Sequence, residues 1–133
     1  MSYIKPHMVE AFANSKLERL DGGAAFLAFK MVPAGRFHWC HIMLTPLGLM
    51  IGGDQRFGDT NHGVAIAPGY GLDMFLKSDE DYLGSKFFGR EPSGKVGRER
   101  WQNDVGWMAA LRNEFVRIYK TLETAAPSRV GIV

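Results

Sequence analysis

Residues 36–52 read RFHWCHIMLTPLGLMIG, two apolar runs joined by a Pro-Leu-Gly turn. The runs Arg36–Thr45 and Leu47–Gly52 have the length of strands and are rich in residues that favour them. Since the link at Pro46-Leu47-Gly48 has room only for a tight turn, we expect an antiparallel hairpin. The alternating side chains of the first run are largely apolar on both sides, which predicts a central strand covered on both faces.

Two more runs of strand length flank this hairpin. Ala24–Val32 precedes it, before a break at Pro33-Ala34-Gly35, and His62–Ala67 follows it. None of the links holds a helix long enough to cross from one parallel strand to the next. The four runs therefore predict an antiparallel meander rather than a parallel sheet.

Helix patterns stand at both ends of the chain. Residues 5–20 predict an N-terminal helix, with Pro6 at a first helical position and a partial apolar stripe from Met8 to Leu20. Residues 98–124 predict a long C-terminal helix, because large apolar side chains recur at steps of three and four residues from Trp101 to Leu122. The predicted class is α+β: an antiparallel sheet packed by an N-terminal helix and a long C-terminal helix.

The segment between the strands and the last helix is less regular. Tyr70–Lys77 fits either a short helix or irregular structure. Ser78 is expected to cap a helix that begins with the acidic run Asp79-Glu80-Asp81, where the carboxylates complement the helix dipole. Residues 89–97 contain three Gly and one Pro, which predicts a flexible loop.

Length and composition restrict the classes of protein. The 133 residues suit one domain, 1–133, with a loosely ordered tail over 125–133. With 46% hydrophobic residues, the chain is too apolar for a disordered protein. Its apolar runs are shorter than the ~18 residues that span a bilayer, and residues 1–20 are too charged for a secretory signal, so we expect no membrane partner. Cys40 is the only cysteine, which excludes an intrachain disulfide and favours a reducing, cytoplasmic location.

Charge is unevenly distributed, although the net charge of the chain is only +2. Residues 1–53, 54–81 and 82–133 carry net charges of +2, −4 and +4. In the last third, basic residues lie close together at Lys86, Arg90, Lys95, Arg98 and Arg100. A polarised surface steers partners, and the interleaved Phe87, Phe88 and Trp101 leave nucleic-acid binding open. Because Trp101 begins the apolar stripe of the last helix, we expect it to face the core.

Two patterns suggest chemistry, and each has a simpler structural explanation. His38, Cys40 and His41 include potential zinc ligands and a potential nucleophile, but the chain has no second Cys to complete a metal site. The stretch 89–96 nearly spells a phosphate-binding loop, yet Val96 replaces the hydroxyl that binds the metal and no parallel unit surrounds it. We therefore predict no catalytic residue, metal or cofactor, and favour a non-enzymatic protein. A small enzyme, or a ligand- or metal-binding domain that uses the His38/Cys40/His41 region, is the alternative.

Short motifs in the middle of the chain carry a family resemblance. They are Leu49-Met50-Ile51-Gly52-Gly53-Asp54 after the predicted turn, Met74-Phe75-Leu76-Lys77, and Tyr82-Leu83-Gly84-Ser85-Lys86-Phe87. In this order, between residues 36 and 88, they resemble small proteins encoded by bacteriophages and other mobile elements. The resemblance assigns no catalytic residue. It implies a phage setting, in which such proteins are often inhibitors of host defence, anti-CRISPR proteins among them.

We therefore expect a non-enzymatic binding protein that inhibits or modulates a host protein or ribonucleoprotein complex, such as a CRISPR–Cas effector, in the bacterial cytoplasm. Loops carry binding residues more often than core strands do. The predicted contact residues are Asp54, Arg56 and Phe57 in an exposed loop over 54–61, and Arg90, Lys95, Arg98 and Arg100 in the basic segment. A nucleic-acid-binding accessory protein acting through residues 86–100, and a homodimer, are further alternatives.

Overall fold

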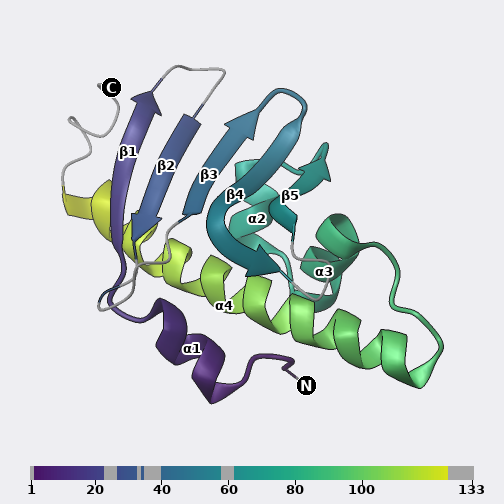
Figure 1. Ribbon diagram of the computed structural model, residues 1–133. Helices are drawn as coiled ribbons and strands as arrows, with labels where there is room; N and C mark the ends of the chain where they lie inside the picture. The colour runs from purple at the N-terminus through teal and green to yellow at the C-terminus, as the bar shows by residue number, and fades with distance from the viewer. Residues whose placement is uncertain (1, 23–26, 33, 35–39, 58–61, 126–133) are drawn as a thin grey trace.

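The computed structural model describes residues 2–22, 27–32, 34, 40–57 and 62–125. In these ranges the elements follow one another as α1 (Pro6–Phe12), β1 (Lys16–Gly22), β2 (Leu27–Val32), β3 (Cys40–Thr45), β4 (Gly48–Phe57), β5 (His62–Pro68), α2 (Leu72–Lys77), α3 (Glu80–Phe88) and α4 (Lys95–Ala125) (Figure 1). The chain is an α+β protein with an N-terminal helix and a long C-terminal helix, as the sequence predicts.

The strands form one antiparallel sheet in the order β1-β2-β3-β4-β5, so each strand pairs with its neighbour in sequence. This is the predicted antiparallel meander with one more strand, β1, than the four predicted. β3 and β4 form the predicted hairpin, in which Thr45 pairs with Gly48. Gly48 has a φ of +139°, and a Cβ there would lie 2.4 Å from the carbonyl oxygen of Ala67. Glycine is therefore required at this turn.

β4 is longer than predicted. It runs to Phe57 instead of ending at Gly52, and Phe57 pairs with His62 of β5 after an irregularity in the ladder. Asp54, Arg56 and Phe57 therefore belong to a strand, and the prediction of a loop at these residues is wrong. The pairing with β5 extends the strand through a segment whose glycines suggest a break.

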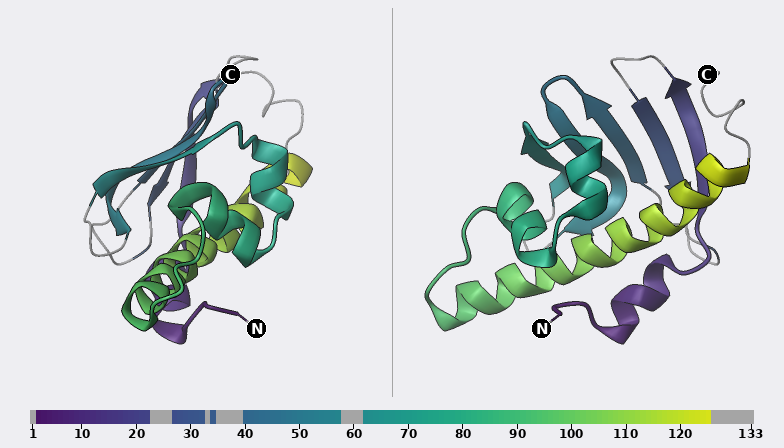
Figure 2. Two further views of the ribbon diagram at one scale, coloured as in Figure 1. Left: turned by 90° about the vertical axis from the view of Figure 1, so that its right-hand side faces the viewer. Right: turned by 180° about the vertical axis from the view of Figure 1, so that it is seen from behind.

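All the described helices lie on one side of the sheet (Figure 2). The side chains that face them are buried, among them Phe29, Met31, Cys40, Ile42, Leu49 and Ile51. On the other face Met43 and Met50 are only partly buried, and Ile66 is 50% exposed. The prediction that the second run is covered on both faces is therefore wrong within the described residues. Apolar surface is common on the outside of proteins, so two apolar faces do not require two covering layers.

The N-terminal segment changes from helix to strand halfway along. α1 ends at Phe12, Asn14 has a left-handed backbone with a φ of 55°, and the Ser15 hydroxyl donates to the Phe12 carbonyl at 2.6 Å. Residues 16–22 then pair with β2. The predicted helix over 5–20 is thus wrong beyond Phe12, because pairing with β2 outweighs the modest helical preference of these residues.

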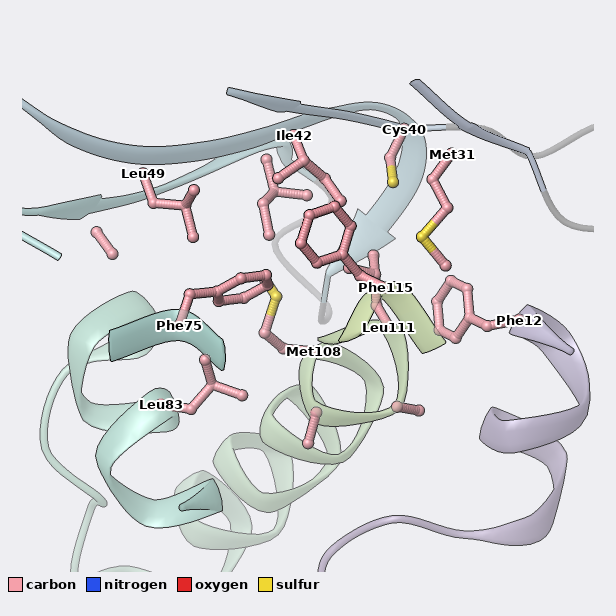
Figure 3. Close-up of a cluster of buried hydrophobic side chains, with 14 of the residues drawn as sticks. Phe12, Met31, Cys40, Ile42, Leu49, Phe75, Leu83, Met108, Leu111 and Phe115 are labelled. Carbon is pink, nitrogen blue, oxygen red and sulfur yellow. The ribbon is translucent and has the colours of Figure 1, made fainter. Parts of the chain in front are cut away.

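α4 crosses the sheet and supplies the predicted apolar stripe to the core. The buried large side chains of this stripe are Trp101, Val105, Met108, Leu111 and Phe115. Phe115 and Met108 enter a cluster closed by Phe75 from α2 and Phe12 from α1 (Figure 3). α4 begins at Lys95, so the last part of the predicted 89–97 loop is helical.

The short helices α2 and α3 complete the layer beside α4. Tyr70–Lys77, which from sequence fits either a short helix or irregular structure, is mainly helical, because α2 spans Leu72–Lys77. α3 is capped by Asp79 and not by Ser78 as predicted, since a carboxylate oxygen of Asp79 accepts from the backbone N–H of Tyr82 at 2.8 Å. Within the described ranges, no helix combines the length and the apolar character needed to cross a bilayer.

Candidate interaction site

The first turns of α4 extend beyond the sheet (Figures 1 and 2). The helix has 31 residues and is about 46 Å long, whereas a sheet of five strands is only about 20 Å wide. One end of α4 must therefore project. We call residues 90–100, the projecting turns and the link before them, the basic end.

Four of the predicted contact residues lie in the basic end, and all four are exposed: Arg90, Lys95, Arg98 and Arg100. The same segment holds two carboxylates, Glu91 and Glu99. Arg90, Lys95 and Arg98 make no ion pair with any residue in the described part of the chain. Exposed cations of this kind attract anionic partners over about 10 Å at ordinary ionic strength.

Trp101 fastens the start of the basic end to the body of the protein. Its indole N–H donates to the carbonyl of Gly89, the last residue before the basic end, at 2.8 Å. The side chain is buried, as predicted for the first member of the stripe. Gly84 in α3 permits this packing, since a Cβ there would lie 2.4 Å from Val105 and 2.9 Å from Trp101. Arg90 therefore follows directly on a residue held by the core.

The link between α3 and α4 makes two further contacts with α4. The side-chain amide of Gln102 donates to the Glu91 carboxylate at 2.9 Å. Gly97 lies against Pro92, so that a Cβ on Gly97 would be 3.1 Å from that ring. Together with the Trp101 bond, these contacts give the exposed cations a defined backbone.

The remaining predicted contact residues, Asp54, Arg56 and Phe57, lie at the end of β4, and their side chains are outside the described residues. The rest of the predicted loop, residues 58–61, is also outside them. The structure thus brings together the four cations of the basic end, and it describes no surface that joins them to the end of β4.

The acidic run Asp79-Glu80-Asp81 is used inside the molecule. Asp79 caps α3, and Glu80 accepts from the backbone N–H of Tyr3 and from the hydroxyl of Ser2, both at 2.7 Å. Asp81 accepts from the Tyr3 hydroxyl at 2.8 Å, and this bond, together with burial, raises the pKa of Tyr3 to about 12. The run therefore begins a helix, as predicted, and also fastens the N-terminal segment to it.

Cys40 and His41 are neighbours in β3, so their side chains point to opposite faces of the sheet. The Cys40 thiol is 2% exposed within the core (Figure 3), and burial raises its pKa to about 12. A buried neutral thiol is a poor nucleophile and a poor metal ligand. His38 and the side chain of His62 lie outside the described residues. Within those residues, no group of three or more His, Cys, Asp or Glu is placed to hold a metal ion.

The aromatic residues near the basic end belong to the core. Trp101 is buried, and Phe87 and Phe88 are partly buried against the core cluster. The Lys86 ammonium lies 5.3 Å from the centre of the Tyr82 ring, within the range of a cation–π contact. A nucleic acid at the basic end would therefore meet cations that bind phosphate, whereas Phe87, Phe88 and Trp101 are packed against the protein and are poorly placed to stack on its bases.

One charged residue in an unusual position was not singled out from the sequence. Arg112 follows Leu111 on the buried side of α4 and is only 7% exposed. Its spacing gives the signal, because it lies four residues after Met108 and three before Phe115, within the apolar stripe. A cation at a core position of a helix calls for a structural or functional explanation.

No family model, curated protein or solved structure matches this chain. Activities, substrates and partners are therefore not carried over from relatives. The geometry of the basic end and the surroundings of Arg112 are the features from which function is inferred.

Proposed function

We propose that this chain is a non-enzymatic binding protein that inhibits or modulates a host macromolecular complex by occupying a site on it. The observation that carries the proposal is the basic end, in which exposed cations project from the body on a backbone held by buried Trp101. Such a surface is complementary to an acidic or phosphate-rich site on a partner. The resemblance to phage proteins makes a bacterial defence complex, such as a CRISPR–Cas effector in the host cytoplasm, the preferred target.

The fixed backbone of the basic end favours inhibition in which this protein blocks a site on its partner. A protein that blocks a site needs affinity and shape, and it needs no reacting group. Contacts between α4 and the preceding link already fix the backbone of Arg90 and Arg98, so little backbone order has to be gained on binding. The buried state of Cys40 removes the one candidate thiol nucleophile from solvent.

A matched pair of charge reversals tests the role of the basic end. Arg98→Glu reverses a charge there, and Lys16→Glu makes the same change at an exposed residue of β1. From a lysate of the host bacterium, the tagged wild-type chain and K16E should retain the same complex, in amounts that fall as salt rises. R98E should lose most of it. Equal retention by R98E and the wild type would contradict the proposed surface.

Inhibition requires a separate measurement. In a bacterial strain whose CRISPR–Cas effector restricts a phage, expression of the wild-type chain should restore plaque formation toward the level of a strain without the effector. R98E, expressed to the same level, should restore it less than K16E does. Full restriction in the presence of well-expressed wild-type chain would reject this class of target.

Direct nucleic-acid binding is a second candidate, because the cations of the basic end also match phosphates. Since the neighbouring rings are packed in the core, such binding would be sensitive to salt and tolerant of sequence. Fluorescence anisotropy with labelled duplex DNA and single-stranded RNA should then show a salt slope that becomes shallower in R98E. Absence of binding at low salt would exclude this candidate.

A further inference from the structure

A hollow of about 390 Å³ lies where the end of α2 meets the C-terminal half of α4. Its polar lining residues are Lys77, Ser78, Arg112, Asn113, Arg117 and Lys120. Four of them are cations, and none of the described lining residues is a carboxylate. The volume falls in the lower part of the range of about 300–1,000 Å³ that is usual for small-molecule sites.

Arg112 is the buried cation of this hollow. Its Nη1 donates to the carbonyls of Phe75 at 3.0 Å and Ser78 at 2.8 Å, and its Nε donates to the side-chain oxygen of Asn113 at 2.8 Å. All three partners are neutral, whereas buried charges are usually paired with opposite charges. Burial lowers the pKa of Arg112, which reflects the cost of placing this charge away from water.

The second terminal nitrogen of Arg112, Nη2, has no hydrogen-bond partner among the described residues. No buried side-chain nitrogen or oxygen in the described part of the chain lacks a partner. Nη2 must therefore be accessible, and Arg112 lines the hollow. The hydrogen bonds of Nη1 give Arg112 a structural role, because they hold the carbonyls of Phe75 and Ser78. They do not explain why Nη2 lacks a partner among the described residues, or why three other cations line the same hollow.

Asp79 and Glu80 follow the lining residue Ser78 and attract Arg112 electrostatically, but Asp79 caps α3 and Glu80 accepts from Tyr3 and Ser2. The other nearby carboxylates, Asp73 and Glu114, pair with cations of the lining. Lys77 lies 3.1 Å from Asp73 with side chains 72% and 76% exposed, and a pair so exposed contributes little and opens easily. Arg117 is held by two bonds to Glu114, at 2.8 and 2.7 Å. Arg117 is thus fixed in place, while Lys77 is able to turn toward a ligand.

We propose that this hollow binds a small phosphorylated molecule through its phosphoryl group. Nη2 of Arg112 donates to a phosphoryl oxygen, and Lys77 and Lys120 supply further positive charge, a combination that suits oxyanions. The remaining lining residues, Leu76 and Val116, offer apolar contact to the organic part of the ligand. Inorganic phosphate carries the same negatively charged oxygens as a phosphoryl group and is therefore the simplest ligand for this site.

This site is independent of the basic end. Arg98 and Arg112 lie about 21 Å apart along α4, at a rise of 1.5 Å per residue. A ligand in the hollow therefore leaves the projecting turns of α4 uncovered. The two proposals are tested by different variants, and failure of one does not imply failure of the other.

NMR titration of the full chain at constant ionic strength tests the proposal. The probes are chloride, inorganic phosphate and glycerol 3-phosphate. Both phosphates should cause saturable shifts of the backbone amides of residues 76–78 and 112–120, and chloride should not. Lys77→Gln/Lys120→Gln should weaken phosphate binding about tenfold, since two charge–charge contacts with the ligand are lost. Lys5→Gln/Lys16→Gln removes the same charge at exposed residues outside the hollow and outside the basic end, and it should leave the affinity unchanged.

The outcomes separate the ligand sources and the competing explanations. Tighter binding of glycerol 3-phosphate identifies a phosphate ester as the ligand, and equal binding identifies phosphate itself. Arg112→Lys keeps the charge but removes the forked donor, and it should weaken binding in a chain whose spectrum shows it to be folded. Absence of saturable phosphate binding by the wild type overturns the proposal. Equal weakening in the two double variants overturns it as well, because that result is a general charge effect.

Discussion

Replacing Gly84 of α3 by alanine tests the contact that positions the basic end. The new Cβ would lie 2.4 Å from a methyl carbon of Val105 and 2.9 Å from the ring of Trp101. Trp101 is not free to move away, since its indole N–H is bonded to Gly89. Overpacking a buried site costs roughly 1–3 kcal/mol, while alanine recovers about 1 kcal/mol of helix propensity. Since Trp101 is held and Val105 is fully buried, the overpacking cost is expected at the upper end, about 3 kcal/mol, and the net loss in the free energy of unfolding is about 2 kcal/mol.

Urea denaturation measures this loss as a lower midpoint at an unchanged m-value. Gly94→Ala is the control, because nothing lies within 4 Å of a Cβ at that position, and it should change stability little. In the G84A background, Val105→Ala removes a clashing methyl and should cost less than it does in the wild type. A G84A chain as stable as the wild type would refute the close packing of α3 on α4.

Three further predictions concern single side chains. Cys40 is buried, and burial raises its pKa to about 12. It should therefore react with a thiol reagent at mildly alkaline pH only after the protein unfolds. If the native protein were labelled as fast as the denatured chain, that result would contradict the burial of Cys40. Tyr3 has a pKa raised from 10.0 to about 12, so its contribution to stability is complete below pH 10 and is lost as pH rises toward 12. Tyr3→Phe should remove that part of the pH dependence in unfolding measurements, and identical profiles for variant and wild type would count against the bond to Asp81. Arg112→Met leaves the carbonyls of Phe75 and Ser78 without their donor, so it should lower the free energy of unfolding by roughly 2 kcal/mol. Urea denaturation measures this change. An unchanged midpoint would show that Arg112 does not hold the end of α2.

The features predicted correctly from sequence depend on local pattern. The apolar stripe that begins at Trp101 repeats at helical spacing over several turns, so the long helix follows without knowledge of any distant residue. Pro46 restricts the backbone and Gly48 permits the positive φ of a tight turn, so the two apolar runs beside them are placed to pair. The hairpin, the meander and α4 are therefore readable from the chain itself.

The features predicted wrongly depend on residues far away in the sequence. In β1, Leu17 is partly buried and Glu18 is exposed, but so short an alternation cannot be told from a continuation of the helix that begins at Pro6. β1 is a strand because it pairs with β2. The end of β4 is set in the same way, by the pairing of Phe57 with His62.

The candidate sites, too, are only partly predictable from the sequence. The cations of the basic end are visible as a cluster in sequence, whereas their support by Trp101 and Gly84 is a property of the packed helices. The hollow at Arg112 needs α2 and α4 to meet, since Lys77 and Arg112 come from separate helices. From sequence alone, the readable sign is a single arginine inside an apolar stripe.

The acidic run and the basic end differ in how their charged side chains are bonded within the protein. The carboxylates of Asp79-Glu80-Asp81 cap α3 and hold the N-terminal segment, so they are engaged before any partner arrives. Arg90, Lys95 and Arg98 have no such ion-pair partner within the described residues. Residues 90–100 carry four cations and two carboxylates, so a net charge of +2, equal to that of the whole chain, is concentrated in the basic end. The uneven order of charges along the chain, more than their total, indicates where a partner is expected to bind.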